Sequence, residues 1–262
     1  MTLSDTEIHT LATHLEAAER HRKPVAQITD DYPDLDMQDA YAIQTAIREI
    51  KIAGGHVVVG LKMGLTSYAK MKQMQVDTPI SGFLMDYGSY PNGAEIDAAA
   101  FIHPRIEAEV AIVTRTVLRG PECDKWAVLD AIQSVMPAVE IIDSRYADFR
   151  FNLESVIADN TSAAGFVTGS TKAWAEELDL AALEVVLEKN GEVADTGTGA
   201  AVLGHPAESV AMLANMLADR NEEIPAGSFI MTGGITAAVA VASGDSVQVR
   251  YDELGTISMK FV

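Results

Sequence analysis

Two glutamates separated by one residue form the first candidate site in this sequence. Glu107 and Glu109 lie in residues 105–110 (RIEAEV), where charged and apolar residues alternate as in a β-strand. Side chains two residues apart point to the same face of a strand, roughly 6.6–6.8 Å apart along it. Two neighbouring carboxylates repel each other unless something positive lies between them. The alternative is that both belong to the solvated face of an exposed strand.

A third carboxylate extends this pattern. Glu140 lies within residues 135–142 (VMPAVEII), which are otherwise apolar. A buried carboxylate is costly unless it is paired or binds a metal ion. Carboxylate oxygens with no cysteine or histidine cluster nearby favour a hard cation, Mg²⁺ or Mn²⁺. We therefore predict a metal site formed by Glu107, Glu109 and Glu140.

Lys62 is the second candidate, because it interrupts an apolar segment between Gly60 and Gly64. Backbone can approach a ligand closely at glycines. A lysine in a partly dry site can act as a charge partner or as an acid–base group. The alternative is that its long side chain extends from the strand end into water.

The composition excludes several classes of protein. The 262 residues carry 19 Lys and Arg against 38 Asp and Glu, a formal net charge of −19. Such a surface repels phosphate, so we expect no nucleic-acid partner, and an anionic substrate would need local positive charge. The single cysteine, Cys123, rules out a disulfide scaffold. We see neither a signal peptide nor a membrane-spanning run, so we expect a cytoplasmic protein with no membrane partner.

Local signals predict a helical arm followed by a strand-rich unit. Ser4 and Glu7 have capping-box spacing, and Asp36 precedes a second helix that ends at Gly54. Residues 1–55 thus form an N-terminal helical arm, which we expect to pack over a catalytic unit of residues 56–262.

Strand signals dominate the second unit. The Asn190-Gly191 pair predicts a hairpin, and residues 247–251 and 256–262 predict a closing strand pair. Helices are expected at residues 124–134 and from Pro206 onward. Because these helices are inserted among the strands rather than alternating with them, the pattern favours an α+β fold over a doubly wound sheet.

Five segments, taken in order, resemble one family. They are residues 60–67 (GLKMGLTS), 105–109 (RIEAE), the strand that carries Glu140, 159–162 (DNTS) and 203–206 (LGHP). Together they resemble the 2-oxopent-4-enoate hydratase / 4-oxalocrotonate decarboxylase family of the fumarylacetoacetate hydrolase superfamily, over essentially the whole chain. The resemblance implies a mixed β-roll with flanking helices.

The resemblance also implies roles for individual residues. Glu107, Glu109 and Glu140 would bind Mg²⁺ or Mn²⁺, and Lys62 would be the catalytic residue beside a bound 2-oxo acid. The residues expected to contact the substrate are Leu65, Ser162, Thr232 and Gly233.

Two positions distinguish the branches of this family. Hydratases carry an aspartate after the proline that matches Pro79, where it helps to activate water, whereas this chain has Ile80. Hydratases also have TGALG where this chain has residues 232–236 (TGGIT). Both departures resemble the decarboxylase branch. They imply decarboxylation of 2-oxo-3-hexenedioate to 2-hydroxypenta-2,4-dienoate and CO₂, in the meta-cleavage degradation of aromatic compounds.

Alternatives and partners follow from the same comparison. A 2-oxopent-4-enoate hydratase, an acylpyruvate hydrolase and a non-catalytic module with a structural cation are the alternatives. The substrate class is a small 2-oxo dicarboxylic acid. The resemblance implies a complex with the partner 2-oxopent-4-enoate hydratase, which would protect an unstable dienol. The sequence leaves open whether the chain also forms a homo-oligomer.

Overall fold

Each of the two helices of the N-terminal arm begins with a capping box. The computed structural model describes residues 2–68, 71–72, 76–170, 172–174 and 178–262. Ser4 caps α1 (Asp5–His21) through a capping box with Glu7, as predicted, and Asp36 caps α2 (Met37–Ala53) in the same way with Asp39. Gly54 follows the last residue of α2, as expected. The connection between the two helices contains one short 3-10 turn, η1 (Ile28–Asp30).

The later helices are short and are inserted between strands. They are α4 (Lys125–Ala131), α5 (Leu153–Ala158) and α6 (Pro206–Ala218). Pro206 begins α6, where its missing N–H costs nothing. The helix predicted at residues 124–134 ends early, because Ile132 and Ser134 already pair with the neighbouring strand. Sheet pairing overrides the local helical pattern there.

The larger sheet carries the candidate residues. Within the described residues it has eight strands, in the order β2-β1-β10-β5-β6-β7-β3, with β11 paired to β5. Their bounds are β1 (Val58–Gly64), β2 (Ile80–Met85), β3 (Ser89–Pro91), β5 (Arg105–Thr114), β6 (Ile132–Ile142), β7 (Ala163–Thr168), β10 (Phe229–Met231) and β11 (Val239–Ala240). Parallel pairs (β1 with β10, β3 with β7) and antiparallel pairs coexist, so the sheet is mixed.

The smaller sheet has five strands in the described part of the chain. They are β4 (Glu95–Ile96), β8 (Glu184–Lys189), β9 (Glu192–Thr198), β12 (Ser246–Tyr251) and β13 (Gly255–Phe261), in the order β4-β13-β12-β8-β9. Asn190 and Gly191 join β8 to β9 with φ of 56° and 81°, which confirms the predicted hairpin. The predicted closing pair is β12 with β13.

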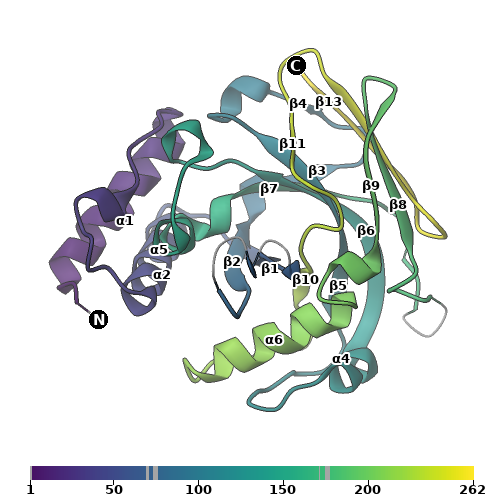
Figure 1. Ribbon diagram of the computed structural model, residues 1–262, viewed down its shortest axis with the longest axis horizontal. Helices are drawn as coiled ribbons and strands as arrows, with labels where there is room; N and C mark the ends of the chain where they lie inside the picture. The colour runs from purple at the N-terminus through teal and green to yellow at the C-terminus, as the bar shows by residue number, and fades with distance from the viewer. Residues whose placement is uncertain (1, 69–70, 73–75, 171, 175–177) are drawn as a thin grey trace.

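Apolar side chains from both sheets and the helices decide which face of β5 is available for chemistry. Ile106, Ala108 and Val110 belong to the main core together with Val249 and Ile257 of the smaller sheet. Because side chains alternate along a strand, Glu107 and Glu109 point to the opposite face. The α+β prediction is confirmed. In Figure 1 the long strands β5, β6 and β7 curve around the interior, with α1 and α2 on one side and the β8–β9 hairpin on the other.

The arm packs on the larger sheet through a second apolar cluster. Leu15 of α1 and Ile43 of α2 share this cluster with Phe83 of β2 and Ile157 of α5. Among the described residues, no helix combines the length and apolar character needed to cross a bilayer.

Candidate functional site

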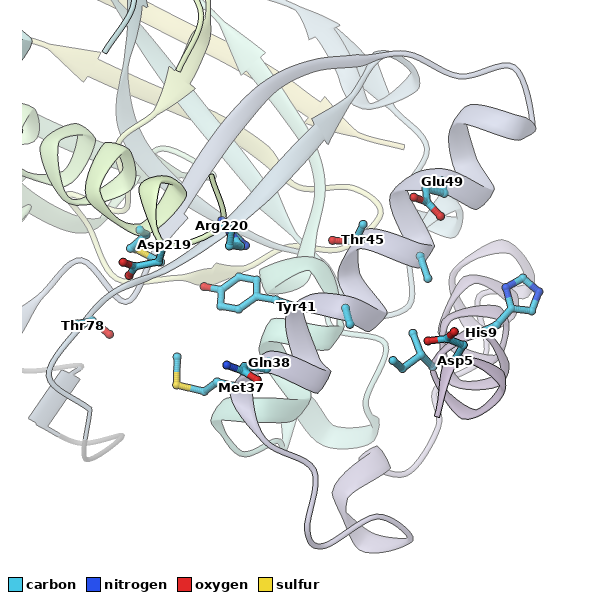
Figure 2. A pocket seen from close by; sticks show the side chains of 14 residues that line it. Asp5, His9, Met37, Gln38, Tyr41, Thr45, Glu49, Thr78, Asp219 and Arg220 are labelled. Carbon is cyan, nitrogen blue, oxygen red and sulfur yellow. The ribbon is translucent and has the colours of Figure 1, made fainter. Parts of the chain in front are cut away.

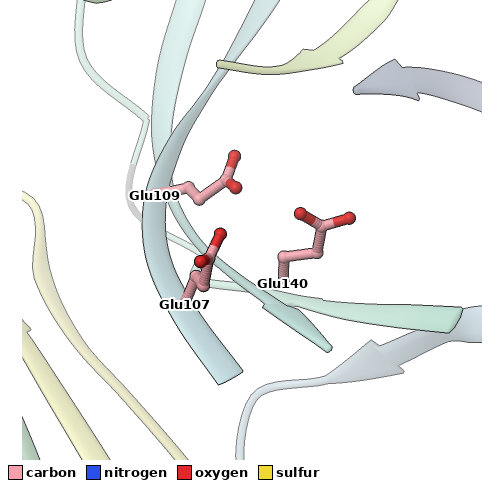
Figure 3. Close-up of side chains that lie close together, drawn as sticks. All are labelled: Glu107, Glu109 and Glu140. Atoms are coloured by element: carbon pink, nitrogen blue, oxygen red, sulfur yellow. The ribbon is translucent and has the colours of Figure 1, made fainter. Parts of the chain in front are cut away.

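Three glutamate side chains converge on the inner face of the curved sheet. Strands β5 and β6 pair antiparallel, with Glu107 directly opposite Glu140. Glu109 follows two residues later on the same face of β5. Each glutamate contributes one oxygen to a group in which all atoms lie within 4.8 Å of one another. Figure 3 shows the three carboxylates directed toward a common point. The structure thus brings together the three carboxylates that the sequence singled out.

Because two of these carboxylates are buried, keeping all three negatively charged without a cation is energetically costly. Glu109 and Glu140 are 0% exposed, and Glu107 is half-buried. The alternative in which Glu107 and Glu109 form a solvated strand face is therefore wrong for Glu109, whereas Glu107 keeps part of its surface exposed. Burial raises the pKa of Glu109 well above its ordinary value, and the charge of Glu140 raises it further. Burial also raises the pKa of Glu140, although Lys62 opposes this shift.

The hydrogen bonding of the carboxylates indicates what would stabilise them. Glu109 Oε2 accepts a hydrogen bond from the backbone N–H of Gly233, with a donor–acceptor distance of 2.8 Å. Among the described residues, Glu109 Oε1 and Glu140 Oε2 have no hydrogen-bond donor, although both are buried. Buried carboxylate oxygens without donors are expensive, and they are the ligands that Mg²⁺ and Mn²⁺ prefer. The residues present therefore fit a hard divalent cation.

Lys62 provides positive charge at the same place. It lies on β1, is 2% exposed, and its Nζ is 2.9 Å from Glu140 Oε1. The same Nζ donates a hydrogen bond of 3.1 Å to the carbonyl oxygen of Thr161. The alternative in which Lys62 extends into water is wrong, because its side chain points into the cluster of carboxylates.

Ser162 follows Thr161, the residue whose carbonyl oxygen Lys62 contacts, in the short turn η5 (Asn160–Ser162). It is 3% exposed, and no hydrogen-bond partner of its Oγ occurs in the described part of the chain. A buried hydroxyl without a partner is available to a bound molecule. This placement supports its predicted contact with the substrate.

The other three predicted substrate contacts have different surroundings. Gly233 donates its backbone N–H to Glu109. Its φ of +107° is a conformation that glycine adopts readily. There is also no space for a side chain, because a Cβ at this residue would lie 2.0 Å from Thr66 Oγ1. Thr232 is fully buried, and its hydroxyl donates to the carbonyl oxygen of Val110. Leu65 follows β1 and packs against the apolar cluster of the arm. Substrate contact by these residues stays a prediction.

Sequence reasoning missed a buried ion pair between Arg145 and Asp159. Asp159 belongs to the DNTS segment, which entered the sequence analysis only as one of the five segments that carry the family resemblance. Arg145 comes three residues after an apolar strand, and an arginine there is costly unless it is paired. The position of Arg145 so soon after an apolar strand was therefore the signal from which a buried ion pair could have been predicted.

A separate cavity of about 790 Å³ lies between the arm and the C-terminal end of α6. Figure 2 shows Tyr41 of α2 directed toward Arg220, whose guanidinium carbon is 4.5 Å from the centre of the tyrosine ring. None of Lys62, Glu109 or Glu140 lines this cavity. We therefore assign the chemistry to the cluster of carboxylates and not to this cavity.

Comparison with known proteins identifies the family. A family model described as "Fumarylacetoacetate (FAA) hydrolase C-terminal" matches residues 62–262, which include Lys62 and the three glutamates. The chain belongs to the fumarylacetoacetate hydrolase family. The β-roll with flanking helices that the resemblance implied is thereby confirmed.

Two relatives and one solved structure of this family cover essentially the whole chain. The 4-oxalocrotonate decarboxylase of Pseudomonas putida is 56% identical over 261 residues, which span 100% of this chain and 99% of the relative. The 2-oxo-hept-4-ene-1,7-dioate hydratase of Escherichia coli is 38% identical, over 98% of this chain and 99% of the relative. The structure of 4-oxalocrotonate decarboxylase from Pseudomonas putida G7, complexed with magnesium and adipate, matches with a TM-score of 0.98 and 55% identity, over 100% of this chain and 99% of that one.

Proposed function

We propose that this member of the fumarylacetoacetate hydrolase family is a metal-dependent 4-oxalocrotonate decarboxylase. It converts 2-oxo-3-hexenedioate into 2-hydroxypenta-2,4-dienoate and CO₂, in the meta-cleavage degradation of aromatic compounds. The observation that supports this best is the cluster of Lys62 and three glutamates, of which Glu109 and Glu140 are buried, in a chain that is 56% identical along its whole length to decarboxylases of this name.

Glu107, Glu109 and Glu140 would hold the metal ion. Their oxygens and their burial suit Mg²⁺ or Mn²⁺, and the solved relative is complexed with magnesium. When bound, the ion supplies Lewis-acid chemistry, because it withdraws electrons from the carbonyl group of a 2-oxo acid. The half-buried Glu107 marks the side of the cluster that a substrate would reach first.

The substrate is a small 2-oxo dicarboxylic acid, and the solved relative holds adipate, a dicarboxylate. In the reaction, the bond between C5 and the distal carboxylate breaks and CO₂ leaves. The electron pair moves through the C3–C4 double bond onto the oxygen at C2, which then takes up a proton to give the dienol. Lys62 stabilises the negative charge that develops on this oxygen or places the substrate carboxylate. The local charge of the metal site and Lys62 also attracts a dianion into a protein whose formal net charge is −19.

Other residues complete the site in this proposal. Ser162 offers its free hydroxyl, and Gly233, Leu65 and Thr232 line the place where the substrate lies. Ile80, on β2, provides an apolar wall where a water-activating carboxylate would stand in a hydratase. Residues 1–55 form an arm that covers the catalytic unit, residues 56–262.

We also propose a complex with the partner 2-oxopent-4-enoate hydratase. The dienol product is unstable, and direct transfer to a hydratase would protect it. Co-expression of the two chains followed by size-exclusion chromatography tests this. Separate elution at micromolar concentrations would contradict the complex without affecting the decarboxylase assignment.

The reaction itself is tested with two substrates. Protein loaded with Mg²⁺ is incubated with 2-oxo-3-hexenedioate or with 2-hydroxypenta-2,4-dienoate, and CO₂ release and hydration are measured separately. We expect CO₂ from the first substrate and no hydration of the second. Hydration without CO₂ release would indicate a hydratase, and no turnover of either would favour a module with a structural cation.

A further inference from the structure

The turn that faces Lys62 has an unusual backbone. Asn160, Thr161 and Ser162 have φ of 47°, 54° and 56°, so three successive residues other than glycine are left-handed. Such residues cost conformational energy and persist only where their surroundings fix them. The turn presents the Thr161 carbonyl to Lys62 Nζ at 3.1 Å. Whatever holds the turn therefore also sets the position of the lysine.

One side of the turn is held by β2. Asn160 donates from Nδ2 to the carbonyl oxygen of Phe83 and accepts from the N–H of Phe83, both at 2.9 Å. The side-chain amide of Asn160 thus makes with Phe83 of β2 the two hydrogen bonds that the backbone of a neighbouring strand would make. Thr161 Oγ1 donates to the carbonyl oxygen of Ser81 at 3.0 Å.

The two ends of the turn are held by Arg145. Its Nε donates to Asp159 Oδ1, and its Nη2 donates to the carbonyl oxygen of Asp159, which also accepts from the N–H of Ser162 at 2.9 Å. Its Nη1 donates to the carbonyl oxygen of Ala163 at 3.0 Å. Asp159, which precedes the turn, and Ala163, which follows it, are therefore joined through one guanidinium group.

Both members of this pair are deeply buried, Arg145 at 2% and Asp159 at 1% exposure. A buried ion pair is weak support for stability, because removing both charges from water is expensive. A planar group with several fixed donors, however, defines geometry well. We propose that Arg145 and Asp159 are a positioning pair, which fixes the 160–162 turn so that the Thr161 carbonyl holds the Lys62 ammonium against Glu140. This inference rests on the proposed function, because it assumes that Lys62 acts in the reaction.

Arg145→Lys tests the pair, because lysine keeps the charge but cannot join both ends of the turn. We expect kcat to fall roughly 100-fold, the effect of misplacing a reacting group by about 1 Å. KM and the Kd for Mg²⁺ should stay within about threefold of the wild type, since the glutamates are not touched. A crystal structure should show Lys62 Nζ displaced from the Thr161 carbonyl. Asp159→Asn provides a second variant if Arg145→Lys folds poorly.

A double-mutant cycle separates positioning from plain structural support. If Arg145 acts through Lys62, Arg145→Lys should change kcat less than about threefold in a Lys62→Met background. Lys51→Met is the matched control, because Lys51 is also a buried cation, 5% exposed, paired with Glu16 and Glu19 of the arm. It should lower Tm comparably and leave kcat unchanged.

Three results would overturn the positioning role. The first is an additive double-mutant cycle, in which Arg145→Lys lowers kcat equally in the wild-type and Lys62→Met backgrounds. The second is a decrease in kcat of Lys51→Met in proportion to its decrease in Tm. The third is a crystal structure of Arg145→Lys in which Lys62 has not moved. Absence of CO₂ release from the wild type would instead overturn the proposed function. In that case the position of Lys62 in the Arg145→Lys crystal structure and the Kd for Mg²⁺ would still test whether Arg145 and Asp159 position the lysine.

Discussion

Lys62 Nζ lies 2.9 Å from Glu140 Oε1, although two strands separate β1 from β6 in the sheet. Across a flat sheet these strands would be roughly 14 Å apart, at about 4.8 Å per strand. The curvature of the sheet, together with the length of the two side chains, closes this distance. The site therefore depends on the shape of the whole sheet.

Replacement of Lys62 should lower kcat strongly while changing the thermal stability of the protein only slightly. In Lys62→Met the apolar part of the side chain is kept and the charge is lost, so we expect kcat to fall by about 10²–10³. With Mg²⁺ bound, Tm should change by only a few degrees. Steady-state kinetics and a thermal melt of the same sample check this. Loss of the folded state in Lys62→Met would count against a catalytic role.

Metal binding should stabilise the folded protein. At a Mg²⁺ concentration 100 times Kd, binding to the folded state alone adds about 2.7 kcal/mol, which corresponds to a rise in Tm of roughly 5–10 °C. Glu109→Gln should abolish most of this rise, and removal of metal with EDTA should abolish turnover. Glu192→Gln is the control, because Glu192 is exposed on β9. An equal rise in both variants would mean that the cation binds elsewhere.

Gly64 should tolerate no side chain beside the turn. A Cβ at residue 64 would lie 2.5 Å from Thr161 Cγ2. We expect Gly64→Ala to displace the turn, lowering kcat by about tenfold or more and stability by about 1–3 kcal/mol. Adding Thr161→Ser removes the clashing methyl group but keeps the hydroxyl that bonds to Ser81, so the double variant should regain activity. Kinetics no better than those of Gly64→Ala would refute this steric explanation.

Asp39 should make the attachment of the N-terminus pH-dependent. Its carboxylate accepts hydrogen bonds from Thr2, Leu3 and Asp36, and these lower its pKa to about 2, below the ordinary 3.8. Its stabilisation is therefore complete above about pH 4 and is lost as the pH falls through 2. Asp39→Asn should lower the free energy of unfolding by about 1–3 kcal/mol at pH 7. In urea melts, this difference should shrink as the pH is lowered toward 2.5, and a constant difference would exclude the ionised carboxylate as its source.

The sequence by itself determined features that depend on neighbouring residues. Capping by Ser4 and Asp36, the hairpin at Asn190-Gly191 and the start of α6 at Pro206 are local, because each needs only a few residues of known geometry. Strand alternation likewise placed Glu107 and Glu109 on one face.

Only the tertiary structure decided what these residues meet. The end of α4 at Ala131 followed from pairing of Ile132 with β5, and the burial of Glu109 followed from the curvature of the sheet. The ion pair of Arg145 with Asp159 joins residues 14 apart, and the contact of Lys62 with Thr161 joins residues 99 apart. No local rule connects such residues, because their distance depends on how all the intervening strands curve and pack.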